Sequence, residues 1–345
     1  MWRVIGLILA GLGAFLIVIA IVLPTYIAGQ VIKFPLNEFE TATLTATNAS
    51  YFSAIKLKQI DGADLQATYT IQGNAKAGSS NIAVWNEFSY VFDTTNKLQV
   101  EPMSRTFAFD RKTAELVNCC GESINGNSSI RQTGIIGYVF PFNTQKKTYR
   151  VFDTTLDQPE PFVFSGTDTV QGIQTYKYIE NITPTKIGFS QLSSTQPEYY
   201  SLHLTYWVDP ETGALLKVDE SQDQYLVNAI TSARTVTLFK ADLVTTPATV
   251  KTVVGLDNSG RDKIALLRTI LPLILGIVGA LAVVIGFLLS RKPREHAQAS
   301  MAVASYPSPE AATAEQPSVA TTMIPGMDGE RKPVPTAEGD APEPL

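Results

Sequence analysis

The sequence is poor in the residues on which most catalytic and metal sites depend. Its 345 residues include two histidines and two cysteines, and His203 is the only histidine between the two long apolar runs. His203 alternates with apolar neighbours, a pattern typical of a structural or surface position on a strand. No Gly-rich phosphate loop and no dinucleotide fingerprint occurs. We therefore expect no catalytic residues, no metal site and no cofactor, and an enzyme without a recognisable motif stays an alternative.

Clustered positive charge is also missing. The formal net charge is −5, and lysines and arginines do not form a cluster interleaved with aromatic residues. We therefore expect no nucleic-acid partner. A small acidic group is interpreted as solvated strand and turn faces: Asp209, Glu211, Asp219, Glu220 and Asp223.

Polar and charged side chains are absent from two runs, residues 4–23 and 270–289. At about 1.5 Å per helical residue, a run of this length spans about 30 Å, the thickness of a bilayer core. Backbone amides need internal partners in lipid, so each run is predicted to be a transmembrane helix. Pro24 and the residues after it offer no clear Ala-x-Ala site, which favours an uncleaved anchor over a signal peptide. Small residues in the two runs suggest that the helices pack as an antiparallel pair: Gly6, Ala10, Ala14, Gly276 and Ala280.

Positive charge beside the two runs predicts their orientation. Arg3 precedes the first run, and Arg291, Lys292 and Arg294 follow the second, which places both termini in the cytoplasm. Basic residues on the other side weaken this argument: Lys33, Arg261, Lys263 and Arg268. We expect a two-pass protein of the plasma membrane with four segments: 1–28, the cytoplasmic N-terminus and first transmembrane helix; 29–266, an extracytoplasmic domain; 267–290, the second transmembrane helix; and 291–345, a disordered cytoplasmic tail.

Short runs rich in Thr, Val, Tyr and Phe, separated by Asn, Asp, Gly and Pro, fill the segment between the helices. They predict a mainly β (α+β) fold: a large antiparallel β-rich domain between N- and C-terminal transmembrane helices. The clearest hairpin turn is residues 209–213, and similar Asp-x-x-Thr turns follow Phe92 and Phe109. Residues 251–267 are expected to hold a loop and a short helix, with its cap at Asp257, Asn258 or Ser259.

Cys119 and Cys120, the only cysteines, are adjacent. A bond between neighbouring residues closes a strained ring, so three states stay open: a vicinal disulfide, two thiols, or bonds to another chain. We favour a vicinal disulfide that clips the turn at residues 118–123. A redox switch is the less favoured role, and a metal site is disfavoured because no further ligands lie nearby in sequence.

Three segments resemble one family: residues 109–122 (FDRKTAELVNCCGE), 140–149 (FPFNTQKKTY) and 207–213 (WVDPETG). They are similar to the actinobacterial DUF3068 proteins, often labelled the PorA family. The resemblance runs from the first apolar run through the second and implies an integral protein of a Gram-positive, often mycolate-bearing, envelope. It implies no catalytic residues.

The favoured function is non-enzymatic: the domain binds envelope lipid or lipoglycan, or scaffolds the proteins that make it. If an apolar cavity exists, its expected lining is Phe162, Phe164, Tyr176, Tyr178, Tyr206 and Trp207, although ordinary core packing explains these side chains as well. A pore or channel component, as the family label suggests, is the second hypothesis. It sits badly with two uniformly apolar helices that offer no polar lining.

Overall fold

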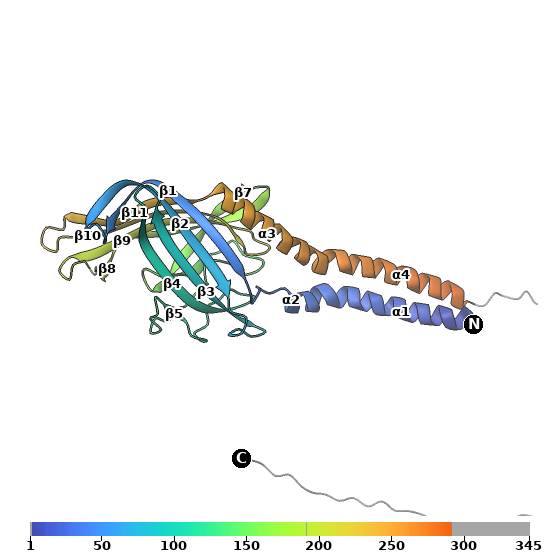
Figure 1. Ribbon diagram of the computed structural model, residues 1–345. Helices are drawn as coiled ribbons and strands as arrows, with labels where there is room; N and C mark the ends of the chain where they lie inside the picture. Colours follow the sequence, from blue (N-terminus) through green and yellow to red (C-terminus); the bar gives the residue numbers. More distant parts are fainter. Residues whose placement is uncertain (1, 191, 292–345) are drawn as a thin grey trace, which may run out of the picture. The chain divides into compact units, whose positions relative to one another are not determined.

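The computed structural model describes residues 2–190 and 192–291 (Figure 1). Most of the predicted tail, 291–345, lies outside the described residues, and so do Lys292 and Arg294, which contributed to the predicted orientation. The described chain is a mainly β domain flanked by two apolar helices, as predicted.

The helices lie at the two ends of the described chain: α1 (Trp2–Val22), η1 (Leu23–Ile27) and α2 (Ala28–Val31) before the sheet, and α3 (Pro247–Ala265), η2 (Leu266–Ile270) and α4 (Leu271–Ser290) after it. Between them lie eleven strands: β1 (Phe39–Ser53), β2 (Lys58–Gly73), β3 (Ile82–Asp93), β4 (Leu98–Asp110), β5 (Ser123–Ile124), β6 (Tyr149–Asp153), β7 (Gln158–Val170), β8 (Ile173–Phe189), β9 (Pro197–Val208), β10 (Leu215–Val227) and β11 (Arg234–Thr245).

Two continuous helical stretches, residues 2–31 and 247–290, are each long and apolar enough to cross a membrane. The second begins well before its apolar run. Its N-cap is Thr246, whose side chain accepts a hydrogen bond from the backbone N–H of Thr249, and Pro247 takes the first helical position. The cap expected at residues 257–259 is therefore wrong, because these residues lie inside α3.

Helices α1 and α4 pack side by side through glycines (Figure 1). A Cβ placed on Gly13 would lie 2.5 Å from the carbonyl oxygen of Gly279, and one on Gly6 would lie 2.7 Å from that of Gly286. Both distances are far below van der Waals contact, so only glycine allows the backbones to approach this closely. The antiparallel pair is confirmed, but its closest contacts follow a spacing of seven residues rather than four.

All neighbouring strands of the sheet pair antiparallel, in the order β5-β4-β3-β2-β1-β11-β10-β9-β8-β7-β6. The first and last strands, β1 and β11, are thus neighbours at the centre of the sheet (Figure 1). The two helical stretches leave the sheet from adjacent strands, and this adjacency brings them together.

The sheet curves into a half-barrel around the segment between β4 and β6. Isolated bridges tie this segment to both sides: Phe109 of β4 pairs with Leu116, and Ile135 pairs with Val151 of β6. Its Phe140 is fully buried in an aromatic cluster that also contains residues of β3, β4, β8 and β9. The inner face of the sheet, the face that covers this segment, therefore holds the main core.

Short turns that begin with Asp or Asn connect many of the strands. The Oδ1 of Asp93 accepts hydrogen bonds from the backbone N–H groups of Thr95 and Asn96, both at 2.8 Å, and Asp110 and Asp153 repeat the arrangement. The chain then needs a left-handed residue to re-enter the next strand, and Lys97 has φ +58°. The predicted Asp-x-x-Thr hairpin turns are confirmed.

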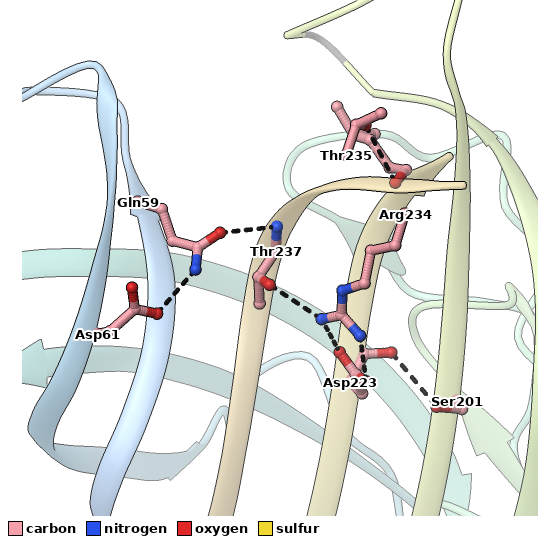
Figure 2. A network of polar contacts seen from close by, with 8 residues as sticks. Gln59, Asp61, Ser201, Asp223, Arg234, Thr235 and Thr237 are labelled. Atoms are coloured by element: carbon pink, nitrogen blue, oxygen red, sulfur yellow. Dashed lines mark hydrogen bonds and ion pairs between the residues drawn. The ribbon is translucent and has the colours of Figure 1, made fainter. Parts of the chain in front are cut away.

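A polar network joins β2, β9, β10 and β11, with Ser201 of β9 donating to the carbonyl oxygen of Asp223 at 3.5 Å (Figure 2). Arg234 of β11 binds Asp223 of β10 with two charged hydrogen bonds of 2.8 and 2.6 Å and also donates to Thr237. Gln59 of β2 accepts a hydrogen bond from the Thr237 backbone at 3.1 Å. The network holds the first residues of β11, which lie beyond the pair of Tyr51 with Phe239 in the ladder between β1 and β11.

Candidate binding cavities

The inner face of the half-barrel carries a row of carboxylates that strand register places side by side. Glu180 of β8 lies directly opposite Leu204 of β9, which lies opposite Glu220 of β10. Directly opposite residues share a face, and two strand spacings amount to about 10 Å, so both carboxylates face the same space. On the other half of the sheet, Glu87 of β3 pairs directly with Arg105 of β4.

These groups surround a polar cavity of about 160 Å³. The lining includes four carboxylates and one cation: Glu87, Asp153, Glu180, Glu220 and Arg105. Four tyrosines from β2, β9 and the inner segment also line it: Tyr69, Tyr138, Tyr200 and Tyr206. Glu87, Arg105 and Glu180 are buried, with exposed fractions of 2, 3 and 2%.

Arg105 is held by neighbours other than a close carboxylate. Its Nε donates to the Oε1 of the fully buried Gln132 at 2.7 Å, and its guanidinium lies 4.7 Å from the centre of the Phe107 ring. The separation from Glu87 is 4.0 Å, at the outer limit for an ion pair. Arg105 therefore neutralises only part of the acidic charge in the cavity.

Burial and mutual repulsion shift the ionisation of the carboxyl groups. Burial, then the negative charges of Asp153, Glu160 and Glu220, raise the pKa of Glu180 to about 9. Burial, followed by the charge of Asp153, raises the pKa of Glu220 to about 7. Burial also raises the pKa of Glu87, although the positive charge of Arg105 opposes this shift. Near neutral pH the cavity thus contains proton-bearing carboxyl groups.

A second, mainly apolar cavity of about 120 Å³ lies where the helices meet the sheet. Phe34 and Pro35, which follow α2, and Val253 of α3 form part of its wall, together with Ile71 and Val218 from the sheet. Two residues, Tyr69 and Tyr138, line both cavities. An apolar space beside the helices therefore adjoins a polar, acidic space farther inside the half-barrel.

The six aromatic residues expected to line a cavity divide between the two faces of the sheet. Phe162 and Tyr206 line the polar cavity, their rings 4.8 Å apart. Phe164, Tyr176 and Tyr178 pack in the adjoining inner core. These five residues share one face.

Trp207 lies on the opposite face of β9 from Tyr206. It packs with Leu216 and Val253 beneath α3, and its indole N–H donates to Asp168 at 2.9 Å. Successive side chains of a strand point to opposite faces. Tyr206 therefore lines the polar cavity, whereas Trp207 lines neither cavity.

The sulfurs of Cys119 and Cys120 form a disulfide in a surface turn between β4 and β5. Cys120 and Gly121 both have positive φ, +64° and +85°, and the backbone N–H of Glu122 donates to the Cys119 carbonyl at 3.3 Å. This turn lies apart from the lining of both cavities. His203 contacts Asn181 and is partly exposed on the outer face of β9.

Most of the chain matches a known family. A family model described as Porin PorA covers residues 5–288, which include most of both apolar helices and all eleven strands. The chain belongs to the Porin PorA family. No curated protein matches it.

The polar cavity of this Porin PorA family member was missed from the sequence. Glu220 was assigned to solvated faces, and Glu87, Arg105 and Glu180 were not singled out. For Glu180 a signal was present: Tyr178 and Ile182 flank it at a spacing of two, so all three share the buried face. An acidic residue in register with buried neighbours is the pattern that would have found it.

Proposed function

We propose that the domain binds an amphiphilic envelope lipid or lipoglycan, with apolar parts in the cavity beside the helices and polar parts in the acidic cavity. The supporting observation is that Tyr69 and Tyr138 line both spaces, so one molecule with an apolar and a polar end fits both. Each space is smaller than the roughly 300 Å³ of ordinary ligand pockets, which favours a headgroup and an adjoining chain over a whole lipid.

In this proposal the protein is not an enzyme, and it presents or holds the lipid for envelope-biosynthesis proteins. The two helices anchor it in the plasma membrane with both termini cytoplasmic and the β domain outside. A lysine reagent that cannot enter intact cells should then modify Lys56 and Lys97 and spare Lys292. Protection of Lys56 and Lys97 in intact cells, with labelling after lysis, would contradict the orientation.

Lipid binding is tested on the full chain, extracted in mild detergent and examined by native mass spectrometry. We expect a lipid adduct. Val218→Trp, which fills the apolar cavity, should lose the adduct, while Val244→Trp, on the outer face of β11, should keep it. Circular dichroism establishes that both variants fold. Absence of any adduct, together with no uptake of added envelope lipid, would refute lipid binding.

The family name suggests a pore, and the sequence offers this as the alternative. Two features favour binding: the residues 4–23 and 270–289 carry no polar side chain, and the inside of the half-barrel is occupied by the segment between β4 and β6. We expect the purified chain to give no conductance steps in a planar bilayer. Reproducible steps would favour the pore over the lipid-binding role.

A further inference from the structure

The polar cavity holds four carboxyl groups and one cationic side chain, so it gains net negative charge as the carboxyl groups ionise. Glu87, Asp153, Glu180 and Glu220 come from four different strands, and Arg105 is the one Lys or Arg in the lining. The Nε of Arg105 donates to Gln132, its Nη2 has no hydrogen-bond partner within the described residues, and its nearest carboxylate is Glu87. Among the described residues, no Lys or Arg forms an ion pair with Glu180 or Glu220, which lie on the other half of the sheet.

Glu180 supplies a second, independent observation. Its side chain is buried, with 2% of the residue exposed, and it lines the cavity. Its Oε1 has no hydrogen-bond partner within the described residues. Buried carboxylate oxygens are almost always hydrogen-bonded, because an unpaired one costs stability. A hydrogen-bond donor on a bound molecule would satisfy the Oε1 of Glu180.

The chemistry of the lining selects the donor. A group that satisfies Glu180 and offsets the charge of its neighbours must carry N–H donors and a positive charge. Tyrosine rings, such as those of Tyr200 and Tyr206 in the same wall, favour organic cations through their negative faces. Among the described residues no group of three or more His, Cys, Asp or Glu side chains could hold a metal ion. These observations favour an organic cation over a metal.

We propose that the polar cavity binds a primary organic ammonium group, which donates hydrogen bonds to Glu180 and lies between Glu180 and Glu220. The inference deepens the proposed function and rests on it where the ammonium group is part of a lipid head. A free amine presents the same chemistry, so the two sources are tested separately.

Binding should strengthen as pH rises, because an ammonium ion prefers ionised carboxylates. Besides burial, three carboxyl groups raise the pKa of Glu180: Asp153 on β6, Glu160 on β7 and Glu220 on β10. Tyr200 and Tyr206 on β9 lie close enough for the charge of Glu180 to raise their own pKa values. Across the cavity lie Glu87, Arg105 and Tyr138. Burial raises the pKa values of Tyr138, Tyr200 and Tyr206, so these tyrosines keep their protons between about pH 6 and 8.5 while carboxyl groups titrate.

The first experiment is a calorimetric titration of ethanolamine into the delipidated full chain in neutral detergent. We expect saturable binding that tightens from about pH 6 to 8.5, and no binding of ethylene glycol, the neutral analogue. Glu180→Gln should weaken ethanolamine binding at least about tenfold, because a charge-assisted hydrogen bond is lost. Glu115→Gln, at an exposed position, should bind like the wild type. Equal binding of ethanolamine and ethylene glycol, or an unchanged affinity in a folded Glu180→Gln variant, would overturn the assignment.

The second experiment offers the same protein vesicles of phosphatidylethanolamine or of phosphatidylcholine, which differ in the N–H donors of the head. Preference for phosphatidylethanolamine, lost in Glu180→Gln, supports a lipid ammonium. Ethanolamine binding without that preference supports a free amine. Equal uptake of both lipids without ethanolamine binding would leave the lipid-binding function standing and refute the ammonium site. Binding of Mg²⁺ with no binding of ethanolamine would assign the cavity to a metal and refute the ammonium site as well.

Discussion

Replacing Glu180 with Gln should stabilise the protein at alkaline pH. The pKa of Glu180 is raised from its ordinary value of 4.5 to about 9. Between these values the folded state keeps a proton that the unfolded state loses, so the free energy of unfolding falls as pH rises. The slope is about 1.4 kcal/mol per pH unit, and the penalty reaches about 4 kcal/mol near pH 7.5. Total stabilities are about 5–15 kcal/mol, so this effect is measurable.

Chemical denaturation of the full chain in detergent, followed by tryptophan fluorescence, measures this effect. The stability of Glu180→Gln minus that of wild type should grow by about 1.4 kcal/mol for each pH unit from about pH 6 to 8. Glu115→Gln, at an exposed position, should follow the wild type throughout. A difference between Glu180→Gln and wild type that stays constant with pH would refute the ionisation argument.

Three other predictions concern the rest of the molecule. Gly13→Leu should separate α1 from α4 and lower the midpoint of thermal unfolding in detergent, because overpacking costs about 1–3 kcal/mol. Gly11→Leu should leave the midpoint unchanged, because open space surrounds Gly11. Equal midpoints for the two variants would contradict the glycine contact. Arg234→Ala should lower the free energy of unfolding, measured by chemical denaturation, by about 1 kcal/mol or less, because its ion pair with Asp223 is partly exposed. A loss of several kcal/mol would contradict this view of the ion pair. Cys119 and Cys120 should resist alkylation before reduction and each gain one label after it, as intact mass reveals; labelling without reductant would refute the disulfide.

The elements with strong local signals were predictable. Two runs of twenty apolar residues can only be helical in lipid, and Asp at the start of a four-residue turn satisfies its own backbone N–H groups. The start of α3 also had a signal that was not used, since Thr246 followed by Pro247 is a favourable cap. The polar residues inside α3 resembled a loop instead.

The cavities were not predictable, because they depend on pairing between distant strands. In β10, polar residues occupy both faces, so alternation gives no clue that Glu220 points inward while Asp219 and Ser221 lie on the other face. Leu204 joins Glu180 to Glu220 only through register across three strands. A single sequence does not contain this register. It does, however, separate Tyr206 from Trp207, which are adjacent on one strand.

The central pairing of β1 with β11 has a consequence for synthesis. β1 is complete by Ser53, but its partner begins at Arg234, so one edge of β1 has no strand beside it while about 180 residues are made. An open edge with unpaired amides invites pairing with another chain. Chains that stall before β11 should therefore aggregate, and assembly of the two halves of the sheet must wait for this last strand.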